Sequence, residues 1–203
     1  MPKKIRRNED IYLAPGILGR YENDEPVAID ENNGYERLNP GNLADKIRIY
    51  KREVEEWFLN PAANMLGQES FRNSFIVLMV CMSYIEGVEQ YKTGTSSNSG
   101  SKAFFVRSFK RLYPNRFQDK HIEKLYSKAR CGLFHNGMVK GGVIFNNDYN
   151  EPIEFEDDGE TIRINPQILL SNIKNDFERY INELTNSANA TTRGKFDRMF
   201  TVL

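Results

Sequence analysis

Arg130 and His135, five positions apart in the stretch KLYSKARCGLFHNGMV, are the residues whose types and spacing could do chemistry. Histidine titrates near neutral pH, so His135 could take up or release a proton during a reaction. Arginine keeps its charge and can hold two phosphate oxygens with parallel donors. Cleavage of RNA by its own 2′-hydroxyl needs both abilities, because protons move while charge builds up on the phosphate oxygens. The pair therefore indicates a candidate phosphodiester-cleaving site.

A helix expected over residues 119–137 must position this pair. At about 100° per residue, its apolar residues fall on one core-facing stripe, which consists of Ile122, Leu125, Tyr126, Ala129 and Leu133. Arg130 lies on the flank of this stripe, and His135 lies nearly opposite it, roughly 140° from Arg130. Cys131 and Phe134 share the outward side with His135, although both residue types prefer burial. For both Arg130 and His135 to touch one phosphate, the helix must distort near the intervening glycine, the long arginine must fold round, or two copies must pool their side chains across a dimer axis.

Ordinary structural roles remain open for the same residues. His135 could cap the C-terminus of its helix, where a positive charge is favoured, and Arg130 could form a simple salt bridge. Glu86 stands at the polar end of another expected helix, over residues 69–91. It could line the site, or it could be a solvated or capping charge.

Two other chemistries compete for Cys131 and His135, which are four positions apart and would share a helix face. They could bind a metal ion, but a structural zinc site needs four ligands, and the sequence does not bring Cys81 and His121 near them. They could form a Cys–His nucleophile, but no orienting group or oxyanion hole is evident. The stretch GTSSNSGS lacks the lysine of a phosphate-binding loop. We therefore expect neither a metal ion nor a cofactor.

The charges are unevenly distributed along the chain. Residues 102–130 hold nine basic residues against two acidic ones, whereas residues 145–185 hold ten acidic residues against three basic ones. Aromatic residues are interleaved in the basic segment, namely Phe104, Phe105, Phe109, Tyr113 and Phe117. A basic, aromatic segment leading into the candidate site is typical of RNA binding, and Lys110, Arg111 and Arg116 are its expected RNA contacts. The alternative is that the aromatic residues belong to the core and the lysines are merely solvated.

Composition restricts the class of protein. The chain has 203 residues, is 39% hydrophobic and carries no net charge, which fits one main globular domain and gives no global attraction to a polyanion. The most apolar stretch, FIVLMVCM, is far shorter than the roughly 20 residues needed to cross a bilayer. The two cysteines show no disulfide spacing, and the basic N-terminus lacks an apolar run behind it. We expect a soluble, cytoplasmic protein without membrane contact.

The periodicity predicts a mainly α fold. Residues 1–40 are rich in Gly, Pro, Asn and Asp, and we expect an irregular arm there. Residues 41–185 should form a helical bundle in which the helix over residues 69–91 is buried on all sides and Pro61 ends the helix before it. A small β-hairpin or meander is expected over residues 142–165, followed by a last helix with Asn165 as its N-cap. Residues 186–203 are expected to be a mobile tail.

An Arg, four residues and a His at the end of a helix, inside a helical core, resemble the HEPN superfamily. The resemblance covers roughly residues 43–140, and only Arg130 and His135 match the family's functional residues. It implies a helical bundle that dimerises and a metal-independent endoribonuclease, acting in phage defence or as a toxin with an antitoxin partner.

One position departs from this pattern. Ribonucleases of the family often carry a polar residue directly after the Arg, and here that residue is Cys131, a weak hydrogen-bonding group. Asn136, directly after the His, could supply a polar group instead. The alternative function is therefore a catalytically inactive, dimeric HEPN-like module that binds RNA or another protein.

Overall fold

The computed structural model of the chain describes residues 4–69, 72–98 and 100–203. It divides into two compact units. The first, which we call the sheet unit, contains the residues up to 60 together with residues 91–95 and 179–203. The second, the motif unit, contains residues 61–90 and 96–178 and therefore both candidate catalytic residues.

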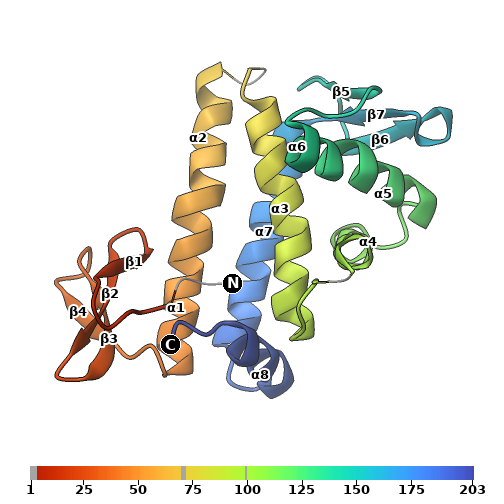
Figure 1. The fold of residues 1–203 in the computed structure, drawn as a ribbon. Coiled ribbons are helices and arrows are strands. Elements are labelled where there is room, and N and C mark those ends of the chain that lie inside the picture. The colour runs from red at the N-terminus through yellow and green to blue at the C-terminus, as the bar shows by residue number, and fades with distance from the viewer. Residues whose placement is uncertain (1–3, 70–71, 99) are drawn as a thin grey trace. The chain divides into compact units, whose positions relative to one another are not determined.

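The sheet unit begins with a four-stranded antiparallel sheet, drawn in red and orange in Figure 1. Its strands are β1 (Ile11–Ala14), β2 (Ile17–Glu22), β3 (Glu25–Asp30) and β4 (Glu36–Leu38), and they neighbour each other in chain order. Asn23 and Asp24, between β2 and β3, both have positive φ angles. A two-residue hairpin turn whose twist matches that of the strands requires positive φ angles at both residues. Asn and Asp adopt such angles more readily than most residues.

The prediction of a mainly α bundle with an irregular N-terminal arm is wrong. The structure is mixed, with 55% helix and 16% strand, and its larger sheet comes first in the chain. The strands of this sheet are only three to six residues long. Strands this short show too few alternating apolar and polar residues to be recognised between the turn residues that flank them. The turn-forming residues therefore predicted an irregular segment.

Helical residues run from α1 (Leu43–Val54) through the π-helical turn η1 (Glu55–Leu59) into α2 (Asn60–Glu69). Asn42 caps the start, because its side chain accepts hydrogen bonds from the backbone N–H groups of Ala44 and Asp45. Pro61 was expected to end this helix but lies inside α2. The π turn comes directly before it, and such wide turns are one way a helix accommodates the hydrogen bond that a proline cannot make.

Aromatic side chains form the core of the sheet unit. Tyr50 and Tyr91 have ring centroids 4.8 Å apart, and Phe196 and Phe200 stack at 5.3 Å. The two phenylalanines are fully buried, and Phe196 belongs to α8 (Ala190–Met199). The segment over residues 186–203 is therefore an ordered part of this core, where the sequence suggested a mobile tail. Its helical period was masked by the Asn, Thr and Gly residues around the two aromatic side chains.

The motif unit combines helices with a three-stranded sheet. It contains α2 from residue 61 onward and the helices α4 (Ser101–Leu112), α5 (Asp119–Leu125) and α6 (Cys131–Asn136). It also contains α3 (Ser74–Thr93) up to residue 90 and α7 (Pro166–Thr185) up to residue 178. Its strands are β5 (Val143–Phe145), β6 (Ile153–Glu156) and β7 (Thr161–Ile164), in the spatial order β5-β7-β6. The α3 and α7 helices lie side by side, joined by the hydrogen bond from Tyr84 to Asp176 (Figure 1).

All three strands lie inside the expected range of 142–165. The expected hairpin or meander is nevertheless wrong as a topology, because β5 pairs parallel with β7, and only β6 and β7 form an antiparallel pair. The predicted cap of the last helix is confirmed. Asn165 caps α7, because its Oδ1 accepts hydrogen bonds from the N–H groups of Gln167 and Ile168. Within the described ranges, no helix is both long enough and apolar enough to cross a bilayer.

The α3 helix differs from its prediction, because it is not buried on all sides. Val77, Leu78 and Cys81 are fully buried, whereas the side chains of Ile76 and Met79 are exposed by 46% and 36%. The sequence of this helix is apolar around most of its circumference, and such a pattern does not reveal which side lacks a neighbour within the chain.

Candidate functional site

The predicted site lies on one run of helix made of α5, the π-helical turn η2 (Tyr126–Arg130) and α6. The core-facing stripe was predicted correctly: Ile122, Leu125, Ala129 and Leu133 are buried, and Tyr126 is half-buried. On the opposite side, Phe134 is 43% exposed and His135 is exposed as well. The structure thus places His135 on the outward face that the sequence indicated.

The distortion of this helix precedes Arg130. The N–H of Cys131 donates to the carbonyl of Tyr126, five residues back, which defines the wide π turn. From Cys131 onward the helix is an ordinary α-helix. Arg130 and His135 therefore still diverge by roughly 140°, and the helix does not turn them toward one phosphate. Two of the three ways to bring the pair to one phosphate therefore remain. The Arg130 side chain can fold round, or two copies of the chain can each contribute side chains across a dimer axis.

Gly132, between the two candidate residues, has a packing role. A Cβ atom at this position would lie 2.7 Å from the carbonyl oxygen of Met138 and 3.0 Å from the nitrogen of Lys140. The helix ends as predicted at Gly137, with a left-handed φ of 70°. The chain then turns back over the helix, and the Lys140 N–H donates to the carbonyl of Lys128 at 2.9 Å. Only glycine leaves room for this return.

Arg130 is held from three sides. Its Nε donates to Oε2 of Glu86, on α3, at 2.8 Å. Its guanidinium lies 4.9 Å from the ring centroid of Phe134 and 5.6 Å from that of Tyr126. Only 20% of the Arg130 side chain is exposed. The two terminal nitrogens make no hydrogen bond to another described residue, so the anchoring through Nε leaves them available to a ligand.

The sequence offered Cys131 and Asn136 as supporting residues of the site, and the structure describes the side chain of Cys131 alone. Burial raises the pKa of the Tyr126 hydroxyl, and a hydrogen bond with Cys131 raises it further. Cys131 also lines an open pocket of about 480 Å³, together with Lys102, Lys120, Glu123, Lys124, Tyr126 and Ser127. Asn136 is the last residue of α6, and its side chain lies outside the described part of the chain.

The basic residues of the segment 102–130 all have acidic partners in the structure. Of the three expected RNA contacts, Lys110 pairs with Asp119 at 2.7 Å, and Arg116 pairs with Glu151. Arg111 donates to Asp176 at 2.9 Å and to the hydroxyl of Ser108. The other basic residues pair in the same way: Lys102 with Glu123, Arg107 with Glu89, Lys120 with Asp158, Lys124 and Lys128 with Glu160, and Arg130 with Glu86. The excess positive charge seen along the sequence is therefore largely balanced in space.

A clamp between α5 and the turn before β7 was not anticipated. Asp158 binds Lys120 and the imidazole of His121, while Glu160 binds Lys124 and Lys128. Lys120, Lys124 and Lys128 recur every four residues and so share one helix face, which was a readable signal. The sequence could not show that two acidic residues more than thirty positions away would meet that face.

No metal cluster emerges among the residues that the structure describes, because they contain no group of three or more His, Cys, Asp or Glu side chains placed to share an ion. Cys81 is fully buried, and this burial raises the pKa of its thiol strongly. His121 lies against Phe155 and Asp158, on the clamp. Neither residue joins Cys131 and His135.

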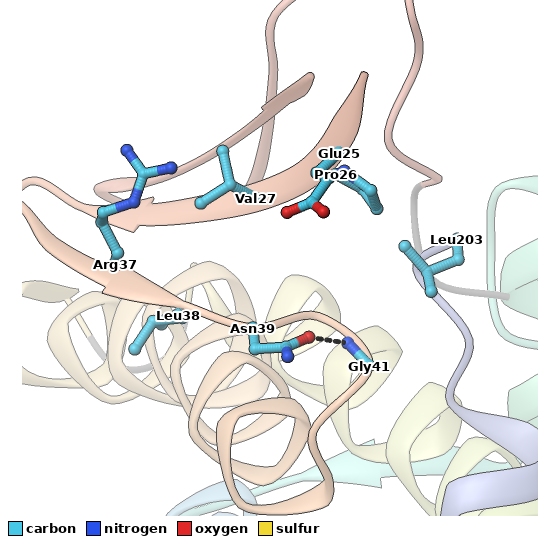
Figure 2. Close-up of a pocket in the computed structure, with 8 residues that line it drawn as sticks. All are labelled: Glu25, Pro26, Val27, Arg37, Leu38, Asn39, Gly41 and Leu203. Carbon is cyan, nitrogen blue, oxygen red and sulfur yellow. Dashed lines mark hydrogen bonds between the residues drawn. The ribbon is translucent and has the colours of Figure 1, made fainter. Parts of the chain in front are cut away.

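A second hollow lies on the sheet unit and is shown in Figure 2. It has a volume of about 520 Å³ and an apolar floor that includes Val27 and Leu38. Two of its polar side chains have partners within the unit: Asn39 accepts the N–H of Gly41 at 2.8 Å, and Arg37 forms an ion pair with Glu22. The hollow holds no histidine or cysteine, so the end of the α5–α6 helix remains the candidate site.

Comparison of the chain with protein-family models, with curated proteins and with solved structures gives no match.

Proposed function

We propose that the protein is a metal-independent endoribonuclease of the cytoplasm in which Arg130 and His135 are the catalytic residues. The observation that carries the proposal is the anchoring of Arg130. Glu86 fixes the guanidinium through Nε, and two aromatic rings flank it, while both terminal nitrogens stay available. A planar guanidinium held in this way suits two-point binding of a phosphate.

The reaction is an attack of a ribose 2′-hydroxyl oxygen on the adjacent phosphorus. His135, in its neutral form, takes the proton from the 2′-hydroxyl. The bond from phosphorus to the 5′-oxygen breaks, and a protonated imidazole supplies a proton to that leaving oxygen. Arg130 stabilises the charge on the two remaining phosphate oxygens. The products are a 2′,3′-cyclic phosphate and a 5′-hydroxyl end.

A second copy of the chain would solve the problem of geometry. Because Arg130 and His135 of one helix diverge, His135 of one copy and Arg130 of another could meet at one phosphate. A dimer would also supply two imidazoles, one as the base and one as the acid. Phe134 and His135 are exposed at the end of α6, and Met138 directly after it is 60% exposed. Phe134 and Met138 offer an apolar rim to such a partner.

A second candidate function is a silent module that dimerises and binds RNA or another protein, such as an antitoxin. The ion pairs of the segment 102–130 favour this reading, since paired lysines and arginines attract a polyanion less strongly. Cys131 favours it too, because a thiol is a weak hydrogen-bonding group beside the guanidinium. Glu86 also weakens the attraction of Arg130 for phosphate.

Incubation of the purified protein with cellular RNA in EDTA separates the two functions. The wild type should yield 2′,3′-cyclic phosphate ends, and His135→Ala and Arg130→Ala should nearly abolish them. Arg130→Lys should fail largely as well, because an ammonium keeps the charge but loses the two-point grip. His121→Ala is the matched control, since His121 lies on the clamp and should leave cleavage intact. RNA binding without cleavage would support the silent module.

A further inference from the structure

Glu86 has both of its carboxylate oxygens engaged. Oε2 accepts the Nε–H of Arg130 at 2.8 Å, and Oε1 accepts a hydrogen bond from the hydroxyl group of Ser97 at 3.4 Å. Glu86 is only 8% exposed, so water has little access to these oxygens. The last torsion of a glutamate side chain has broad energy wells, and a single bond to Oε2 would leave the carboxylate free to turn. The contact to the second oxygen therefore restricts the plane of the carboxylate.

Ser97 is itself held in place, although it lies in a loop rich in Ser, Thr, Asn and Gly. Ser97 is half-buried, its N–H donates to Oε1 of Gln90 at 3.1 Å, and its carbonyl accepts the N–H of Gly100 at 2.9 Å. Glu86 and Gln90 stand four positions apart on α3, so they lie on the same side of that helix. Two side chains of α3 therefore bind one residue of the loop, and its hydroxyl group has a fixed position from which to donate.

The plane of the Glu86 carboxylate affects the two terminal nitrogens of Arg130. A guanidinium group is planar and rigid, so its three nitrogens turn together. Any rotation of the carboxylate redirects the Nε–H and turns both terminal nitrogens with it. Two-point binding of a phosphate tolerates little misorientation, because both N–H donors must point at their oxygens at the same time. The direction of these nitrogens thus depends on the group that holds Oε1 of Glu86.

We infer that Ser97 is a positioning residue, which orients the guanidinium of Arg130 through the carboxylate of Glu86. Ser97 acts only through Glu86 and is therefore not a catalytic residue. The consequence for cleavage rests on the proposed function, whereas the effect on Arg130 does not and is measured without RNA. The contact of 3.4 Å is long for a hydroxyl donor, so we expect an effect of about threefold rather than a complete loss.

Hydrogen exchange of the Arg130 Nε–H with water, followed by NMR on the full-length protein, measures how firmly this group is held. The signal is assigned by its absence from Arg130→Lys. In Ser97→Ala this proton should exchange about threefold faster than in the wild type, because its acceptor carboxylate has lost one of two donors. Ser97→Thr keeps a hydroxyl group and should restore slow exchange. Ser96→Ala is the matched control and should exchange at the wild-type rate, since Ser96 is exposed in the same loop and makes no hydrogen bond to another described residue.

A double variant shows whether Ser97 acts through Glu86. Glu86→Ala alone should speed the exchange of the Arg130 Nε–H, since its acceptor is gone. Adding Ser97→Ala to Glu86→Ala should not change the rate further, because the only connection between Ser97 and Arg130 has already been removed. A loop that merely holds the fold together would give the same added effect in both backgrounds. That result, or equal exchange in Ser97→Ala and Ser96→Ala, would overturn the inference.

Cleavage of an oligoribonucleotide in EDTA measures the consequence for the reaction. Ser97→Ala should lower kcat about threefold and leave KM nearly unchanged, because the orientation of Arg130 matters most where charge builds up on the phosphate. Ser97→Thr should restore kcat. Faster exchange in Ser97→Ala without any cleavage by the wild type would overturn the proposed function and still support the role of Ser97 in holding Arg130. An active wild type with an unchanged kcat in Ser97→Ala would overturn the inference.

Discussion

Arg130 and Glu86 are 44 positions apart in the sequence and are joined by a hydrogen bond of 2.8 Å from Nε to Oε2. The bond connects the end of the π turn to α3. It fixes an arginine on the flank of its helix, and its two terminal nitrogens make no hydrogen bond to any other residue that the structure describes. Under the proposed function, the same bond places a negative charge beside the bound phosphate. The pair would then trade affinity for the phosphate against a fixed orientation of the guanidinium.

Glu86→Gln should reveal this trade. The amide oxygen can still accept the Nε–H, but the negative charge is gone, so RNA should bind more tightly, by roughly threefold to tenfold. The cleavage rate should fall, because a neutral acceptor holds the guanidinium less firmly. Binding is measured by fluorescence anisotropy with a labelled oligoribonucleotide in EDTA, and cleavage is measured on the same oligonucleotide.

Glu123→Gln is the control for that variant. Glu123 is an exposed acid that pairs with Lys102 and lines the neighbouring pocket, so its loss changes the net charge equally without touching Arg130. If both variants strengthen RNA binding to the same degree, only general charge is at work. In that case Arg130 has no special part in holding phosphate.

Arg111→Gln and Lys110→Gln, one position apart, should differ sharply in stability. Arg111 binds Asp176 and lies 3.5 Å from Glu89, and both carboxylates are almost fully buried. Its removal takes away the cation shared by both buried carboxylates, of which Glu89 keeps its ion pair with Arg107 and Asp176 keeps the hydrogen bond from Tyr84. The loss should lower the free energy of unfolding by about 1–3 kcal/mol. Lys110 forms an exposed ion pair with Asp119, so Lys110→Gln should change that free energy by less than about 0.5 kcal/mol.

Urea denaturation monitored by circular dichroism measures both values. The result decides how RNA binding should be tested, because weaker binding by an unstable Arg111 variant would carry no information. Lys110 and Arg116 are the two members of the predicted trio that can be replaced for this purpose. Equal stability of the Arg111 and Lys110 variants would contradict the assignment of Arg111 to a structural network.

Acid should loosen the clamp between α5 and the turn before β7. Lys120 and His121 lower the pKa of Asp158 from 3.8 to about 2, and Lys124 and Lys128 lower that of Glu160 from 4.5 to about 2. Both groups bind fewer protons in the folded state, so their stabilising contribution is complete above about pH 4.5. It is lost as the pH falls toward 2.

Urea midpoints measured between pH 6 and pH 2 test this expectation. The wild type should lose stability over this range, and Glu160→Gln should lose less, because one of the two titrating groups is gone. Glu154→Gln is a suitable control, since Glu154 lies on the adjacent strand and, within the described residues, binds none of these lysines. Identical pH profiles for the wild type and Glu160→Gln would show that the clamp adds nothing to stability.

Phe196→Ala should unfold the sheet unit much more easily. Phe196 is fully buried against Tyr50, Tyr91 and Phe200, so its truncation should cost about 3–5 kcal/mol. The single tryptophan, Trp57, belongs to the same unit, and its fluorescence in urea reports on this unit directly. Thr191→Ala, on the exposed side of α8, should change little. A mobile tail would instead make both variants indistinguishable from the wild type.

The orientation and the end of the candidate helix were well predicted, because both depend on residues within the helix itself. The spacing of Ile122, Leu125, Ala129 and Leu133 fixes the core side, and the outward position of His135 follows from the same rotation. The cap at Gly137 follows from the conformational freedom of glycine. The π turn was not foreseen, since the wide turn depends on what the helix contacts and no residue type within Tyr126–Arg130 demands it.

The rest depended on contacts between distant residues. Glu86 could be named as a candidate, but its bond to Arg130 required knowledge of how α3 and the motif helix meet. The acidic partners of Lys120, Lys124 and Lys128 come from the turn between β6 and β7. The sequence of the segment 102–130 therefore suggested a larger excess of positive charge than the folded structure has. The N-terminal sheet was missed because its strands are short and are separated by many turn residues. Their pairing depends on contacts with the neighbouring strands, which the local sequence does not show.

The π turn over Tyr126–Arg130 makes the length of the candidate helix adjustable. A π turn holds about one residue more than an α turn, so a helix can take in or lose a single residue there without rotating its two ends against each other. The lysines of the clamp lie on or before this turn, and the interval from Arg130 to His135 lies after it. A one-residue deletion within the turn would thus be absorbed as ordinary α-helix, whereas one between Arg130 and His135 would swing the imidazole by about 100°. Tolerance of single-residue length change is therefore expected to end at Arg130, and the interval from Arg130 to His135 is the length-sensitive part of this helix.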